Sequence, residues 1–195
     1  MQALNLLRIQ AHANHMANLR LQGALAALSD AEFQAPRTGF FPSLQATLDH
    51  IVAVDAYYVG VPHGDAGLAE AWQTRVPKRT LADWHSAQQA VDQRLIAWLL
   101  AADDAALDAP VHMPRGMGRV QIDAAAHMLQ HLFSHQTHHR GQVHAMLSST
   151  GVAPPQLDEF LMPSEPHLRR AEMAALGWDE AAVYGHQNVA RQSVR

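Results

Sequence analysis

The sequence contains no cysteine among its 195 residues. Without a thiol the chain forms no disulfide bond, offers no thiolate to a metal ion and has no cysteine nucleophile. Charge of one sign is also scarce, because 14 basic side chains are set against 18 acidic ones and no basic block stands out. We therefore do not expect nucleic acid to be bound through neutralised phosphates.

Long apolar runs are missing as well. No run approaches the roughly 18 residues of a membrane-spanning helix, and the N-terminal stretch has a histidine every few residues. It lacks the charged start, apolar run and small-residue cleavage site of a secretory signal. We expect a protein that does not contact membranes and that resides in the cytoplasm, where the absence of disulfides is usual.

Strand patterns are nearly absent, and apolar residues recur instead at helical spacing. This predicts long amphipathic helices over residues 3–28, 43–60, 81–99 and 123–151. Ser29 with Glu32 is a capping-box pattern, Ser43 and Thr80 are candidate caps, and Gly151 is a candidate terminator. Residues 61–79 are expected to be a loop with a short helix near 69–72. Residues 103–118 are rich in acidic, proline and glycine residues, and the segment VHMPRGMGRV at 111–120 is expected to be a short extended excursion or hairpin.

Four amphipathic helices favour an all-α fold, a four-helix bundle with a C-terminal extension. We expect the bundle domain to cover residues 1–160. Residues 161–195 are expected to form a partly helical tail, with one further helix near 168–184.

The segment His127–His144 holds six of the chain's 14 histidines. On a helix, His131, His135, His139 and Gln142 fall on one side. His135 and His139 are four residues apart, so they project from successive turns and can offer two nitrogens to one metal ion. Zinc, nickel, iron, copper and manganese all accept imidazole.

A third ligand would have to come from elsewhere in the bundle. His50 is the leading candidate, because it lies in the middle of a helix beside the apolar stripe; His12, His15 and His131 are the alternatives. His131, His135 and His139 cannot all bind one ion, because His131 and His139 are about 12 Å apart along the helix axis. Histidines in such positions can also be ordinary core residues whose imidazoles are satisfied by backbone carbonyls or hydroxyls.

Four segments resemble the DinB family over roughly residues 1–160. They are MANLRL from Met16, FPSLQATLDHIVAVD from Phe41, HLFSHQTHHRGQVHAML from His131 and GVAPPQLDEF from Gly151. The resemblance implies a four-helix bundle with a divalent metal ion on His50, His135 and His139, and a homodimer. The sequence departs from the family pattern at Met16, where relatives commonly have tryptophan.

Three neutral imidazoles leave coordination positions open for water or substrate. We therefore expect one divalent metal ion per chain, with nickel and zinc favoured and iron and manganese acceptable. A metal-bound water suits a hydrolase, and the family resemblance implies metal-activated thiol chemistry. The function expected is therefore that of a metal-dependent enzyme, a hydrolase or thiol-dependent transferase that acts on a small molecule. The alternatives are a non-catalytic, metal-stabilised or stress-associated bundle that serves as a binding module, and a helical interaction module without metal.

Four neighbouring side chains are expected to support the site: Gln142, His131, Tyr57 and Arg140. Gln142 could orient a ligand imidazole or a water molecule. Tyr57 or Tyr58 could place a hydroxyl group near the site. Arg140 points away from the histidine pair, and we expect it to pair with a carboxylate, that of Asp55 or Asp49.

Overall fold

The structure, a computed structural model, describes residues 3–185. These residues are mostly helical, which confirms the all-α prediction at that level. The chain divides into two compact units, Met1–Pro155 and Gln156–Arg195; the expected domain boundary at residue 160 stays a prediction. None of the described helices has both the length and the apolar character needed to cross a membrane.

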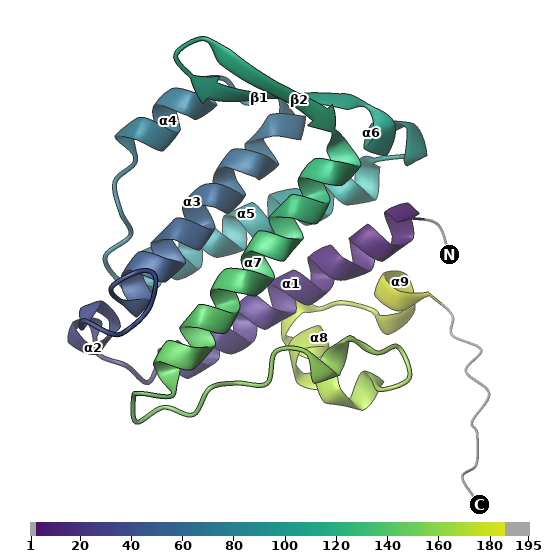
Figure 1. Ribbon diagram of the computed structural model, residues 1–195. Helices are drawn as coiled ribbons and strands as arrows, with labels where there is room; N and C mark the ends of the chain where they lie inside the picture. The colour runs from purple at the N-terminus through teal and green to yellow at the C-terminus, as the bar shows by residue number, and fades with distance from the viewer. Residues whose placement is uncertain (1–2, 186–195) are drawn as a thin grey trace, which may run out of the picture. The chain divides into compact units, whose positions relative to one another are not determined.

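The first unit contains four long helices, α1 (Ala3–Leu25), α3 (Leu44–His63), α5 (Leu81–Ala101) and α7 (Ala125–Leu147), together with shorter elements. α1 contacts α5, α5 contacts α3, α3 contacts α7, and α7 contacts α1 (Figure 1). Their apolar faces meet in a core that includes Met16, Leu21, Leu48, Ile51, Leu95, Leu99, Leu129 and Leu132, each at most 2 % exposed. Burial of these side chains is the main stabilising contribution to the unit.

The predicted helix caps are present. At α2 (Asp30–Gln34), Ser29 and Glu32 form the reciprocal capping box. The Ser43 hydroxyl accepts the Ala46 N–H at 3.0 Å and opens α3. The Thr80 hydroxyl accepts the Asp83 N–H at 3.1 Å and opens α5. Each cap satisfies a backbone donor that the first turn of a helix leaves without a partner.

Several predicted helix ends are wrong. α3 continues beyond Gly60 to His63 and ends at Gly64, whose φ of 72° is left-handed. α7 begins at Ala125, because Asp123 is paired with Val111 in a strand. α7 ends at Leu147, before Gly151 is reached.

The segment predicted as an excursion or hairpin forms an antiparallel hairpin of β1 (Pro110–Gly116) and β2 (Arg119–Ala124). It follows α6 (Asp104–Asp108) and contacts α3 and α4 (Leu68–Thr74). The short helix expected near 69–72 is therefore confirmed as α4. The hairpin and α4 lie at one end of α3 (Figure 1).

The second unit contains the 3-10 turns Glu159–Leu161 and Pro166–Arg169, followed by α8 (Arg170–Leu176) and α9 (Glu180–Tyr184). The single helix expected near 168–184 is wrong, because Gly177 takes a left-handed φ of 65° and ends α8. Within this unit the Arg169 side chain is fully buried. It pairs with Glu180 and lies 3.7 Å from the centre of the Tyr184 ring.

Candidate metal centre

Three histidines from two helices meet where α3 packs against α7. His50 of α3 and His135 and His139 of α7 each offer one imidazole nitrogen, and these nitrogens lie within 4.8 Å of one another. The Nε2 atoms of His50 and His135 are 3.0 Å apart. The structure thus brings together the three residues that the sequence proposed as ligands; we call them the histidine cluster.

The histidine cluster is electrically neutral near pH 7. Burial, reinforced by the neighbouring imidazoles, lowers the pKa of His135 to about 3 and that of His50 to about 4. Burial also lowers the pKa of His139, against the opposing effect of its hydrogen bond to Gln142. Neutral imidazoles keep the lone pairs that a metal ion requires.

Gln142 is hydrogen-bonded to one member of the cluster; its role in orienting a metal ligand stays a prediction. Its Oε1 accepts a hydrogen bond from Nδ1 of His139 at 2.8 Å, and its Nε2 donates to Nε2 of His138 at 3.1 Å. A proton on Nδ1 of His139 leaves Nε2 as the lone-pair nitrogen. This fixed tautomer is typical of metal-binding histidines.

The donor set of the cluster fits a divalent ion that accepts imidazole. It comprises three neutral nitrogens, and no carboxylate belongs to it. Nitrogens bound to one zinc ion at about 2.0–2.1 Å lie roughly 3.3 Å apart in tetrahedral geometry. The 4.8 Å spread of the cluster is slightly wider, so the imidazoles would have to close in around an ion.

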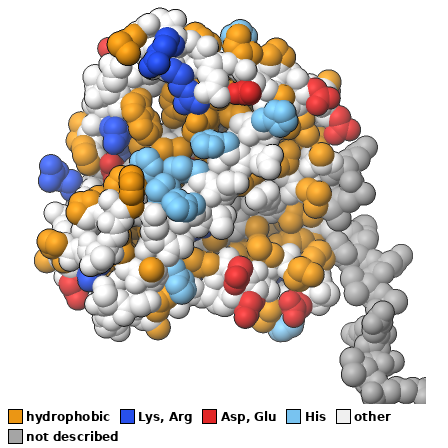
Figure 2. All heavy atoms as spheres, viewed as in Figure 1, with side chains coloured by type: hydrophobic (Ala, Val, Ile, Leu, Met, Phe, Trp, Pro, Cys, Tyr) orange, Lys and Arg blue, Asp and Glu red, His pale blue; other side chains and the backbone are white. Residues whose placement is uncertain are grey.

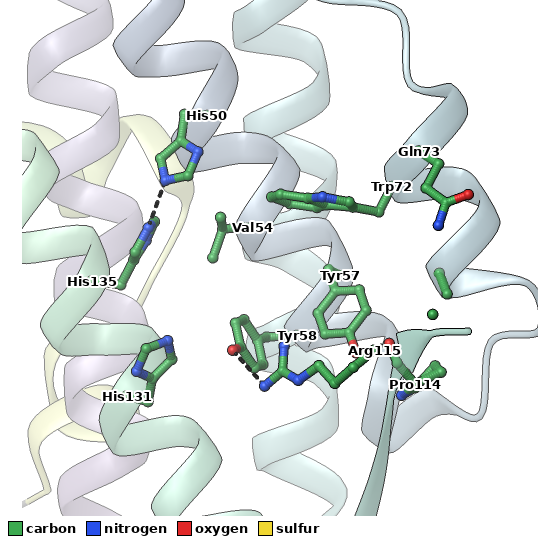
Figure 3. Close-up of a pocket in the computed structure, with 12 residues that line it drawn as sticks. His50, Val54, Tyr57, Tyr58, Trp72, Gln73, Pro114, Arg115, His131 and His135 are labelled. Atoms are coloured by element: carbon green, nitrogen blue, oxygen red, sulfur yellow. Dashed lines mark hydrogen bonds between the residues drawn. The ribbon is translucent and has the colours of Figure 1, made fainter. Parts of the chain in front are cut away.

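A pocket of about 330 Å³ adjoins the cluster. Its lining comes from α3, α4, β1 and α7 and includes His50 and His135, with Trp72, Tyr57 and Tyr58 on other walls (Figure 3). In the space-filling view the histidine side chains gather over α3 and α7 (Figure 2). The cluster is therefore covered by protein on one side and faces this pocket on another.

Two expected neighbours line the pocket without joining the cluster. The ring of His131 lies 6.2 Å from that of His135 and 5.1 Å from that of Tyr58. The Tyr57 hydroxyl donates to the backbone carbonyl of Pro114 at 2.6 Å and so ties α3 to the hairpin. The Tyr58 hydroxyl accepts from Arg115 at 3.0 Å.

The other candidate histidines have different partners. Nδ1 of His12 contacts the carbonyl of Arg8 at 2.7 Å. Nδ1 of His15 lies 2.9 Å from a carboxylate oxygen of Asp92. Both residues belong to α1, and neither is in the histidine cluster.

Arg140 is placed away from the cluster, as expected, but its hydrogen-bond partners were predicted wrongly. It donates to the amide oxygens of Asn14 and Asn18, on α1, instead of to Asp55 or Asp49. Burial lowers the pKa of Arg140, while the negative charges of nearby Asp55 and Asp92 oppose that change.

Sequence reasoning missed the buried polar network to which Arg140 belongs. The Asp55 Oδ2 accepts from Gln88 at 2.8 Å and from Gln136 at 2.9 Å. Asp92 accepts from Asn14, His15, Asn18 and Gln88. A signal was available, because Gln88 and Asp92 are four residues apart on one helix and interrupt its apolar stripe.

Three further residues near the cluster were also missed. The ring of Phe41, in the loop before α3, lies 4.6 Å from that of His50 and 5.6 Å from that of His139. Trp72 and Arg115 line the pocket from α4 and β1. In the sequence, Phe41, Trp72 and Arg115 stand out only as large or charged side chains in segments that were expected to be loop or hairpin.

Similarity to known proteins places the chain in a family. The DinB family model matches residues 3–170. Protein DinB of Bacillus subtilis (strain 168) is 24 % identical over 145 residues, which cover 72 % of this chain and 83 % of that protein. A crystal structure of a DinB-like protein from Bacillus cereus ATCC 10987 has the same fold, with a TM-score of 0.54 and 17 % identity over 72 % of this chain and 89 % of that one. The chain belongs to the DinB family.

Proposed function

We propose that the protein binds one divalent metal ion through His50, His135 and His139 within a four-helix bundle of the DinB type. We further propose that it is a metal-dependent enzyme, a hydrolase or thiol-dependent transferase. The observation that carries the proposal is the meeting of three neutral imidazole nitrogens, within 4.8 Å of one another, beside a pocket of about 330 Å³. A metal site with a purely structural role normally has four protein ligands, whereas this cluster offers three.

The chain's own residues would prepare such a site for chemistry. A divalent ion, with nickel and zinc favoured and iron and manganese acceptable, would supply a Lewis acid for a bound water, thiol or carbonyl group. Gln142 holds the His139 ring through its Nδ1. Phe41 packs on two of the three imidazoles and limits the access of water from its side.

A non-catalytic role for the metal is the second candidate. The observation that favours it is that the three imidazoles come from two helices, so one ion would tie α3 to α7. In that case a chelator would lower the thermal stability of the metal-loaded protein, and no small molecule would compete for the ion. The homodimer and the cytoplasmic location stay predictions.

Metal analysis tests the proposal. Protein purified without a histidine tag and dialysed against zinc or nickel is expected to hold one ion per chain. His135→Ala should lower the affinity by at least about 100-fold, because one of three ligands is lost. His131→Ala is the matched control, since His131 lies one turn away on the same helix and lines the same pocket but is outside the cluster. Equal loss in both variants, or retention of the ion by His135→Ala, would contradict the assignment.

A further inference from the structure

Arg115 carries the positive charge of the pocket that adjoins the histidine cluster. It extends from β1 into the pocket lining, where its guanidinium lies 5.5 Å from the ring centres of both Tyr57 and Tyr58 (Figure 3). One terminal nitrogen donates to the Tyr58 hydroxyl at 3.0 Å, and both that nitrogen and Nε donate to the Gln121 amide oxygen, at 2.9 and 3.1 Å. The guanidinium is therefore held in one orientation.

Arg115 is an exposed residue, so solvent reaches its guanidinium, and within the pocket lining its charge has no carboxylate partner. Its oxygen partners, a phenol and an amide, are neutral. No aspartate or glutamate belongs to the pocket lining drawn from residues 3–185. Asp123 is the carboxylate connected to it, and only through the Gln121 amide, which donates to Asp123 at 2.6 Å. The second terminal nitrogen, Nη1, has no hydrogen-bond partner within the described part of the chain.

The remaining walls combine aromatic and aliphatic surface with the imidazoles of His50, His131 and His135 and the amide of Gln73. Trp72 and the two tyrosines present aromatic surface, and Val54 and Pro114 add aliphatic surface. A volume of about 330 Å³ is near the lower end for ligand pockets, which suits a small molecule. Tethering of the hairpin alone would not require a cation at this position, because a neutral donor could reach the same tyrosine and amide oxygens.

We propose that this pocket binds small organic anions with an aromatic or similarly flat apolar body, and that Arg115 receives their carboxylate or other anionic group. Arginine suits this role because its guanidinium stays charged, and because the N–H groups of Nη1 are left to donate to an anionic oxygen while Nε and Nη2 are held by Gln121 and Tyr58. The inference rests on the proposed function in one respect, that the pocket beside the histidine cluster is where the substrate sits. It makes Arg115 a specificity-determining residue.

Calorimetry with a pair of matched probes tests this assignment. The probes are 3-phenylpropionate and its neutral counterpart 3-phenylpropanamide. Both are titrated into chelator-treated protein, in which no metal ion can receive the carboxylate, and into zinc-loaded protein. Wild-type protein is expected to bind the acid at least tenfold more tightly than the amide in the chelator-treated form.

Arg115→Gln is expected to bring the two dissociation constants within twofold of each other, whereas Arg115→Lys should keep part of the preference. Arg119→Gln is the matched control: it removes the same charge from the other strand of the hairpin, outside the pocket lining, and should leave the preference unchanged. An acid preference that survives in Arg115→Gln, or wild-type protein that binds neither probe in either form, would overturn the proposal.

The two proposals fail in different ways. If zinc does not bind but the chelator-treated protein still prefers the acid through Arg115, the proposed metal function is wrong and the anion site stands. If zinc binds through His135 but Arg115→Gln changes nothing, the metal site stands and the anion site is wrong.

Discussion

Replacing Asp55 by asparagine is expected to change how the stability of the protein depends on pH. Asp55 lies on α3 and is 0 % exposed. Its Oδ2 accepts two amide hydrogen bonds, but its Oδ1 has no partner among residues 3–185. Burial, reinforced by the charge of Asp92, raises the pKa of Asp55 from 3.8 to about 7, against the opposing effects of Gln136, Gln88 and Arg140.

The direction of the effect follows from the raised pKa. Between pH 4 and 7 the folded chain keeps a proton on Asp55 that the unfolded chain has released. The stability from this proton is fully present below about pH 4 and is lost as the pH rises through 7, at about 1.4 kcal/mol per pH unit. Over the shift from 3.8 to about 7, the loss amounts to roughly 4 kcal/mol. The asparagine variant does not titrate and avoids this loss.

Urea unfolding followed by circular dichroism at pH 5, 6, 7 and 8 measures the effect. The difference in unfolding free energy between Asp55→Asn and wild type should move in favour of the variant by about 2–3 kcal/mol from pH 5 to 7. Histidines titrate in both proteins, so their contributions cancel in the difference. Asp108→Asn, which removes an exposed carboxylate from α6, is the control. Parallel curves for Asp55→Asn and wild type would refute the assignment of a buried, protonated carboxyl group.

Two further predictions concern other parts of the chain. Gln142→Ala should weaken zinc binding about 10- to 100-fold, measured by calorimetry, because His139 loses the acceptor that fixes its tautomer. Gln142→Glu keeps an acceptor and should restore most of the affinity. Unchanged affinity in Gln142→Ala would count against this role. Arg169→Ala should destabilise the second unit by about 2–3 kcal/mol, because its buried guanidinium pairs with Glu180. Proteolysis of residues 156–185 at rising urea measures this loss, with the exposed Arg170→Ala as the control that should behave like wild type.

The parts of the fold that depend on local chemistry could be predicted from the sequence. Helix starts at Ser43 and Thr80 are set by a hydroxyl that accepts a backbone N–H three residues ahead, so a short window contains the whole signal. The start of α7 was missed because Asp123 reads as a cap locally, whereas its backbone is used by strand β1, twelve residues earlier. Strand pairing is a contact between segments, and no local pattern encodes it.

The candidate site divides in the same way. The His135 and His139 pair is visible as a four-residue spacing on one helix. His50 lies on another helix, so spacing alone could not show that it meets the pair; the family resemblance singled it out among the other histidines. Trp72 and Arg115 reach the pocket only because α4 and the hairpin pack over the end of α3. The histidine half of the candidate site was therefore predictable, while the residues that α4 and the hairpin add to the pocket depend on tertiary packing.

The histidine cluster and the buried polar network depend on the same two helices. On α7, His135 directly precedes Gln136, so the two side chains point about 100° apart around the helix axis. Gln136 donates to Asp55 of α3 in the core, so this hydrogen bond is one of the contacts made at the observed rotation of α7 against α3. At that rotation His135 faces His50, which lies on α3 five residues before Asp55. A one-residue change in the register of α7 would rotate its side chains by about 100° relative to α3. It would break the Gln136–Asp55 contact and at the same time turn the His135 imidazole away from His50. The Asp55–Gln136 contact in the core and the His50–His135 contact at the candidate site therefore belong to one register of α7 against α3.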